Sequence, residues 1–199
     1  MSEKPLFGMF LRVFLLLVSL YALVHADAGP VSSGESADDV IIDSFEAGPA
    51  AYTTRTRGEA SAALTGRSGI ARHGNRSILV QMAPSGEEGR HSVILTWPFN
   101  EPADWSAYGG LSLWVQTHGD PPPRITPSIV ETGGARYWVK TMPIQPRKEG
   151  EWQRIELPFK EWTWSWEGPE DENGKLDLNQ VKVLQMEIRA SKDAPLTVG

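Results

Sequence analysis

The sequence contains no cysteine among its 199 residues, so the protein has neither disulfide bonds nor a lipid-modified cysteine. It also lacks an excess of positive charge, because 19 Lys and Arg stand against 25 Asp and Glu, for a formal net charge of −6. Nucleic acids and anionic membranes need clustered Lys and Arg that displace counterions, and the basic residues here are scattered along the chain. We therefore expect no nucleic-acid partner.

Recognisable catalytic motifs are also missing. The sequence has no nucleophile elbow, no phosphate-binding glycine loop and no histidines at metal-ligand spacing. A glycosidase needs two carboxylates about 5 to 10 Å apart across a sugar bond. Four acids are available, but nothing in the sequence selects a pair among Glu131, Glu156, Asp171 and Glu187. The absence favours binding over turnover, and we predict no catalytic residue.

The N-terminal 26 residues have the pattern of an export signal. Lys4 and Arg12 precede the apolar run 13–24, and Val24-His25-Ala26 places small side chains at the first and third positions before a cleavage site. An uncleaved membrane anchor is the alternative, but a membrane span needs about 20 apolar residues. We predict a signal peptide over residues 1–26, a secreted or periplasmic protein, and no membrane partner after cleavage.

The rest of the chain is predicted to form a flexible linker and a single domain. Residues 27–39 are small, polar and acidic, and they offer too little apolar surface to offset the entropy of ordering. From Val40 onward, short runs of period two alternate with turns rich in Gly, Pro, Asn and Asp, which is typical of an all-β sandwich. The predicted strands are 40–46, 77–82, 92–97, 110–117, 125–131, 136–142, 152–159 and 182–190.

Alternation along these strands separates a core side from a polar side. In 110–117, Leu111, Leu113 and Val115 point one way, opposite to Trp114 and Gln116. In 182–190 the apolar residues alternate in the same manner with Gln185, Glu187 and Arg189. We expect a ligand on the side that carries the polar groups and Trp114.

Four segments follow one another in a recognisable order: "DSFE" (43–46), "DWSAYGGLSLWVQTHGD" (104–120), "GEWQRIELPFKEW" (150–162) and "NGKLDLNQVKVLQMEI" (173–188). Together they resemble the family eleven carbohydrate-binding modules, which are galactose-binding-like jelly rolls. The resemblance implies a sandwich of two antiparallel sheets with a β-glucan chain in a concave groove. It also implies a structural calcium ion, with Asp43 and Glu46 at positions of metal ligands, although calcium prefers six to eight oxygen ligands.

The resemblance has two departures. Arg189 stands where the family has a tyrosine, and the family's closing strand continues past Gly199 with an aspartate. We therefore expect a domain over 40–199 that is truncated in its last strand, as a piece of a longer protein would be.

The predicted function is that of a secreted, monomeric, non-catalytic module that binds a polysaccharide. Flat aromatic faces would lie under sugar rings, and planar polar groups would bind hydroxyls. The predicted ligand-binding residues are Trp114, Gln116, Tyr137, Trp164, Trp166, Gln185, Glu187 and Arg189. A protein-interaction domain, like the related mitochondrial complex I assembly factor, and a small polysaccharide-degrading enzyme are the alternatives.

The tryptophans divide into two groups. Trp97, Trp105 and Trp152 are expected in the core, and one of Tyr137 and Trp138 is expected there as well. In "EWTWSWEG" (161–168), the family pattern assigns Trp162 to the core and leaves Trp164 and Trp166 outside it. That division requires the chain to leave its strand after Trp162, because strict alternation would point all three the same way.

Overall fold

The computed structural model describes only part of the chain. The described residues are 14–19, 23–24, 40–42, 46, 52–58, 60–65, 77–82, 91–118, 122–139, 142–143 and 151–190. They form strands and two 3-10 turns, η2 (Phe159–Glu161) and η3 (Leu178–Gln180). None of the helices found in these ranges is long and apolar enough to cross a membrane.

One sheet has five strands in the order β12-β8-β1-β6-β5, and every neighbouring pair is antiparallel. Its strands are β12 (Trp152–Pro158), β8 (Gly110–His118), β1 (Phe14–Ser19), β6 (Ser77–Met82) and β5 (Ala60–Thr65). Gly110 is required where β8 meets β12, because a Cβ there would lie 2.7 Å from the Leu157 carbonyl oxygen.

The other sheet has seven strands in the order β13-β10-β9-β14-β7-β4, with β11 paired to β9. Its strands are β13 (Thr163–Trp164), β10 (Arg136–Trp138), β9 (Arg124–Glu131), β14 (Val181–Arg189), β7 (Ser92–Ala103), β4 (Thr53–Arg57) and β11 (Met142–Pro143). A bulge between Val181 and Val183 shifts the register of β14 against both neighbours. A separate pair joins β2 (Leu23–Val24) to β3 (Val40–Ile41).

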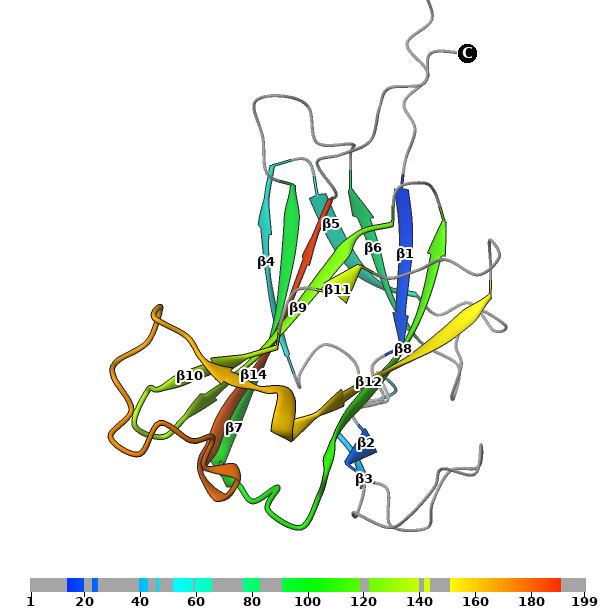
Figure 1. The fold of residues 1–199 in the computed structure, drawn as a ribbon. Helices are drawn as coiled ribbons and strands as arrows, with labels where there is room; N and C mark the ends of the chain where they lie inside the picture. Colours follow the sequence, from blue (N-terminus) through cyan, green and yellow to red (C-terminus); the bar gives the residue numbers. More distant parts are fainter. Residues whose placement is uncertain are drawn as a thin grey trace, which may run out of the picture.

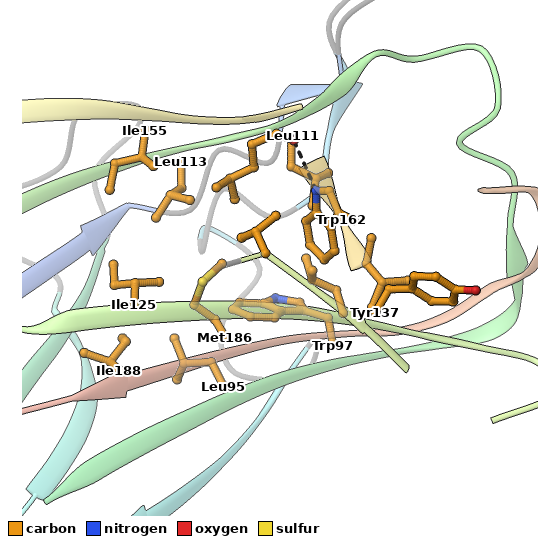
Figure 2. Packing of buried hydrophobic residues seen from close by; sticks show 14 of the residues in the cluster. Leu95, Trp97, Leu111, Leu113, Ile125, Tyr137, Ile155, Trp162, Met186 and Ile188 are labelled. Carbon is orange, nitrogen blue, oxygen red and sulfur yellow. Dashed lines mark hydrogen bonds between the residues drawn. The ribbon is translucent and has the colours of Figure 1, made fainter. Parts of the chain in front are cut away.

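The two sheets enclose one hydrophobic core and form the predicted all-β sandwich (Figure 1). Figure 2 shows Leu113 and Ile155 of the five-stranded sheet facing Ile125 and Ile188 of the seven-stranded sheet. Trp97 lies in the same core at 2% exposure, and Trp105 is also buried, as the sequence predicted for both. Burial of these apolar side chains is the dominant favourable contribution to folding.

Five of the eight predicted strands agree closely with the observed ones, whereas β7 continues to Ala103, six residues beyond the predicted 92–97, and β3 covers 40–41 of the predicted 40–46, in which 43–45 lie outside the described residues. Residues 77–82 match without change, and the strands predicted at 110–117, 125–131, 152–159 and 182–190 differ from those observed by one residue at one or both ends. The predicted strand 136–142 is interrupted after Trp138. Strands β4 and β5 were missed, because "TTRTR" and "ASAALT" have no alternation of apolar and polar residues.

The apolar run assigned to the export signal contributes strand β1. This strand lies between β6 and β8, where Leu17 pairs with Leu79 on one side and with Gln116 on the other. A run rich in Leu and Val suits a central strand as well as the apolar part of a signal peptide. Cleavage near Ala26 would remove β1 from the sheet, and the signal peptide stays a prediction.

Trp162 is buried, as predicted, but the chain leaves its strand before this residue rather than after it. β12 ends at Pro158, η2 turns the chain over the next three residues, and the Trp162 indole donates a hydrogen bond to the Leu157 carbonyl oxygen at 3.4 Å (Figure 2). Proline and the 3-10 turn together end the strand. The turn carries Trp162 into the core and sends the following residues across to β13 in the other sheet.

Candidate functional site

The seven-stranded sheet presents rows of side chains that point away from the core, and we call this side the outer face. Residues directly opposite each other in antiparallel strands lie on the same side of a sheet, so the register defines the rows. Three such rows cross the sheet. The first row holds Thr53, Thr96, Gln185, Ser128, Trp138 and Thr163. The second row holds Arg55, Ile94, Glu187 and Thr126, and the third row holds Arg57, Ser92, Arg189 and Arg124. Leu95 and Met186 lie between the first two rows and point into the core.

Gln185, Glu187 and Arg189 come together in the middle of the outer face. Arg189 Nη2 donates to Glu187 Oε2 at 2.5 Å, and Gln185 Nε2 donates to Thr96 Oγ1 at 3.4 Å. The hydrogen bond that Arg189 donates to Glu187 raises the pKa of the guanidinium. Three of the predicted ligand-binding residues therefore share one surface with an indole, that of Trp138.

Tyr137 is not on this surface. It pairs with Ile129 and Trp164, its side chain is only 1% exposed, and it lies in the core cluster, while Trp138 points to the outer face. The expectation that Tyr137 lies under a sugar ring is corrected by its burial. Sequence alternation predicted that one of these two aromatics is core but did not select which, because β10 has only three residues to establish the alternation.

Trp114 and Gln116 lie in the other sheet and therefore on the opposite side of the sandwich. Trp114 pairs with Arg154, and Gln116 pairs with Trp152. All four side chains are half-buried on the side of β8 and β12 that faces away from the core. A single groove therefore cannot contain both Trp114 and Arg189. Trp152 was expected in the core, and its half-buried position on the far side of β12 corrects that expectation. Periodicity assigned each strand two faces but not the sheet to which it belongs.

A turn that follows β13 borders the outer face beside β10, and we call residues 164–168 the Trp turn. Trp166 is 74% exposed and Trp164 is 40% exposed, which agrees with the expectation that both lie outside the core. Glu167 forms an ion pair with Arg136 of β10 at 3.8 Å. The negative charge of Glu167 also contributes to the raised pKa of Arg189. Glu167 therefore places the Trp turn beside the outer face, whereas Trp164 lies opposite Tyr137 and on the core side of the sheet.

Backbone contacts hold the Trp turn close to the sheet. Ser165 is fully buried, and its N–H donates to the Arg136 carbonyl oxygen at 2.8 Å, while the Trp164 indole donates to the Pro169 carbonyl oxygen at 3.1 Å. A Cβ on Gly168 would lie 2.9 Å from the Arg136 backbone nitrogen. Only glycine permits this approach without a shift of the turn.

A polar network anchors the segment that follows the Trp turn. The Tyr137 hydroxyl donates to Asp171, and Glu131 accepts a hydrogen bond from the Asp177 N–H. The Tyr137 bond lowers the pKa of Asp171, and burial raises the pKa of Tyr137 and of Glu131. Tyr137 thus anchors the segment that follows the Trp turn from its position in the core, and it does not point to the outer face.

The carboxylates considered for catalysis do not form one site. Glu156 lies on the five-stranded sheet beside Arg154, and Glu187 lies on the outer face of the other sheet. Glu131 is 6% exposed and, together with Asp171, belongs to the network that anchors the loop. Neither of these two acids is exposed beside Glu187.

The structure does not test the predicted calcium site. Asp43 lies outside the described residues, and Glu46 is exposed. The described part of the chain contains no group of three or more His, Cys, Asp or Glu that could hold a metal ion. Calcium stays a prediction.

The fold is a β-sandwich whose outer face brings polar side chains together with the indole of Trp138. The model of the family "Carbohydrate binding domain (family 11)" matches residues 27–198. The chain therefore belongs to the family 11 carbohydrate-binding modules, which are non-catalytic and bind polysaccharides. A search of the curated proteins finds no match.

Two solved structures of this family are similar to the chain. One is the family 11 module from Clostridium thermocellum in complex with a beta-1,3-1,4-mixed-linked tetrasaccharide, with 17% identity and a TM-score of 0.50 over 75% of this chain and 90% of that one. The other is a solution structure of CtCBM11, with 18% identity and a TM-score of 0.53 over the same shares. At this identity the likeness shows the fold alone.

Proposed function

We propose that this protein is an exported module that binds a β-glucan-type polysaccharide across the outer face of the seven-stranded sheet. The observation that carries the proposal is the convergence of Gln185, Glu187 and Arg189 with the indole of Trp138 in adjacent rows of one surface. The Trp turn extends this surface at the β10 side.

The chemistry of these groups suits sugars. Amide, carboxylate and guanidinium groups donate and accept hydrogen bonds in fixed planar geometry, and an indole offers a flat apolar face for a pyranose ring. The Glu187–Arg189 pair holds both charged groups in place before a ligand arrives, which reduces the entropy lost on binding. A few such contacts support dissociation constants of about micromolar to millimolar, which suffices for a polymeric ligand.

The module is proposed to act without catalysis, as a monomer, and outside the cytoplasm. Family membership supports the first point, and the predicted signal peptide supports export. The match to the family begins at residue 27, directly after the predicted cleavage site.

Calorimetric titration with a mixed-linkage β-glucan tetrasaccharide tests the proposal, because such an oligosaccharide is bound to the Clostridium thermocellum module. Trp138→Ala should abolish measurable binding. Trp114→Ala is the matched control, since it removes a half-buried indole from the opposite sheet and should leave affinity unchanged. Equal loss in both variants, or no heat from any neutral or charged glycan with the unmodified protein, would refute binding at this face.

A further inference from the structure

The outer face carries a second ion pair besides that of Glu187 and Arg189 on β14. It joins Arg136 of β10 to Glu167 of the Trp turn, with 3.8 Å between Nη1 and Oε2. Glu167 lies on a turn, where alternation assigns no face, so the sequence did not connect it with the outer face. We call Arg136 and Glu167 the turn pair.

The two ion pairs lie on either side of the Trp138 row. Arg136 is two residues before Trp138 on β10, so both side chains point to the same side of the sheet, and Arg136 lies opposite Val130. Gln185 belongs to the Trp138 row, and Glu187 lies in the next row on the other side. The indole of Trp138 is therefore flanked on each side by an arginine paired with a glutamate.

Glu167 acts on both of these arginines. It pairs directly with Arg136, and its negative charge also contributes to the raised pKa of Arg189, which lies three rows away from Arg136. The carboxylate of a turn residue thus belongs electrostatically to the same surface as the charged groups of β10 and β14.

The turn pair contributes little to holding the Trp turn on the sheet. The Ser165 N–H donates to the Arg136 carbonyl oxygen, and Gly168 packs against the Arg136 backbone, so the turn is fixed without either charged side chain. The side chains of Arg136 and Glu167 are 29% and 43% exposed, and exposed ion pairs add little stability. Stability therefore does not account for the turn pair.

The turn pair is open to a third group, unlike the Glu187–Arg189 pair. Arg189 Nη2 and Glu187 Oε2 are 2.5 Å apart and share a direct hydrogen bond. The 3.8 Å in the turn pair exceeds the length of a hydrogen bond, so its two groups attract each other while each can still bond elsewhere. A hydroxyl group both donates and accepts, and it can therefore bridge a carboxylate and a guanidinium at this separation.

We propose that the turn pair contacts the polysaccharide, with one sugar hydroxyl bridging Glu167 and Arg136 while the sugar ring lies on Trp138. The inference rests on the proposed function and adds two residues to its site. The hydroxyl donates to the Glu167 carboxylate and accepts from the Arg136 guanidinium, and hydrogen bonds to charged groups are the stronger ones. The Trp turn thus supplies a hydrogen-bonding group as well as the exposed indole of Trp166.

Calorimetric titration with the mixed-linkage β-glucan tetrasaccharide measures the contribution of Glu167. Glu167→Ala should lower the affinity at least about tenfold, because a hydrogen bond to a charged group is lost. Glu167→Gln should lose less, since the amide keeps an acceptor without the charge. The melting temperature of each variant should stay close to that of the unmodified protein. Unchanged affinity in Glu167→Ala would overturn the proposal.

A matched ion pair on the opposite sheet provides the control. Glu156 lies 3.7 Å from Arg154 on β12, and the Glu156 side chain is 50% exposed. Glu156→Ala removes the same charge from the protein and should leave the affinity unchanged. Equal losses in Glu156→Ala and Glu167→Ala would show an effect of net charge and would contradict a contact at the turn pair.

A double-mutant cycle tests the bridging hydroxyl. Arg136→Ala should weaken binding as well, and Arg136→Ala combined with Glu167→Ala should lose less than the product of the two separate losses, because one hydroxyl contacts both groups. Independent losses that multiply would exclude the bridge.

A further comparison separates direct contact from positioning of Trp166. The double variant Trp166→Ala with Glu167→Ala should bind more weakly than Trp166→Ala alone, because the hydroxyl contact does not depend on the indole. Equal affinity of the two would mean that Glu167 acts only through Trp166, and the contact would be refuted.

The two proposals fail separately. Loss of binding in Trp138→Ala with full affinity in Glu167→Ala overturns this inference and leaves polysaccharide binding at the outer face intact. Absence of binding to the tetrasaccharide and to every other glycan by the unmodified protein overturns both.

Discussion

Replacing Trp162 and Trp166 separately with alanine tests how the protein divides its tryptophans between core and surface. The two residues are four positions apart in the sequence, but their side chains are 7% and 74% exposed, respectively. Trp162 contacts the core at Phe159, with ring centroids 6.2 Å apart, whereas Trp166 lies on the turn beside the outer face. The same substitution should therefore act on stability at one position and on affinity at the other.

The magnitudes follow from burial. A buried tryptophan replaced by alanine costs about 3 to 5 kcal/mol, because apolar contacts are lost and a cavity remains. For a domain of this size, each kcal/mol lowers the melting temperature by about 2 to 4 °C, so Trp162→Ala should lower it by roughly 6 to 20 °C. An exposed substitution such as Trp166→Ala changes stability by about 0.5 kcal/mol or less.

The loss of affinity in Trp166→Ala is estimated from area. A tryptophan offers up to about 250 Å², and 74% of this side chain is exposed, so roughly 90 Å² is covered if a sugar ring occupies half of the exposed part. At about 25 cal/mol per Å² this contact contributes about 2 kcal/mol, or about 30-fold in affinity before the costs of association. We expect a loss of at least about tenfold.

Calorimetric titration with the oligosaccharide that binds the unmodified protein measures the affinity, and thermal unfolding of the same samples measures the stability. Trp162→Ala should lower the melting temperature strongly and retain affinity below it. A large fall in the melting temperature of Trp166→Ala with unchanged affinity would refute the reasoning, because it would place the whole 162–166 stretch in the core.

Three further predictions concern the anchoring network, export and calcium. Tyr137→Phe should raise the pKa of Asp171 toward its ordinary value, because the bond that lowers it is lost. The variant should then be less stable at neutral pH and lose less stability on acidification than the unmodified protein, and an unchanged carboxyl titration by NMR would contradict this. Mass spectrometry of the exported protein should show an N-terminus directly after Ala26, and a protein that retains strand β1 would contradict the signal peptide. Saturating calcium should raise the melting temperature relative to chelator-treated protein, and Asp43→Ala or Glu46→Ala should remove the difference; identical curves with and without calcium would argue against the site.

Local pattern was sufficient for much of the fold. Apolar alternation located β6, β8, β9, β12 and β14, since a residue's side of a strand depends only on its position in a period of two. It failed for β4, whose sequence "TTRTR" is exposed at every residue. A polar edge strand is defined by the partner to which it bonds, and that partner is distant in the sequence.

The candidate site was predictable in part. Gln185, Glu187 and Arg189 lie on one strand, so their shared face followed from alternation alone. Trp138 was not selected over Tyr137, because β10 is too short for its face to be assigned without its partner β9. Trp114 was grouped with Arg189 although the two lie on opposite sheets, because alternation does not show which sheet a strand joins.

The sequence by itself determined an all-β protein, the boundaries of five strands to within one residue, the burial of Trp162 and the family. These depend on periodicity, on turn residues and on motifs that are continuous in the chain. Only the tertiary structure decided that Trp114 and Arg189 lie on opposite sheets, and that arginines from β4, β9 and β14 form one row. Their proximity results from long-range pairing of backbone strands, which no local pattern in the sequence determines.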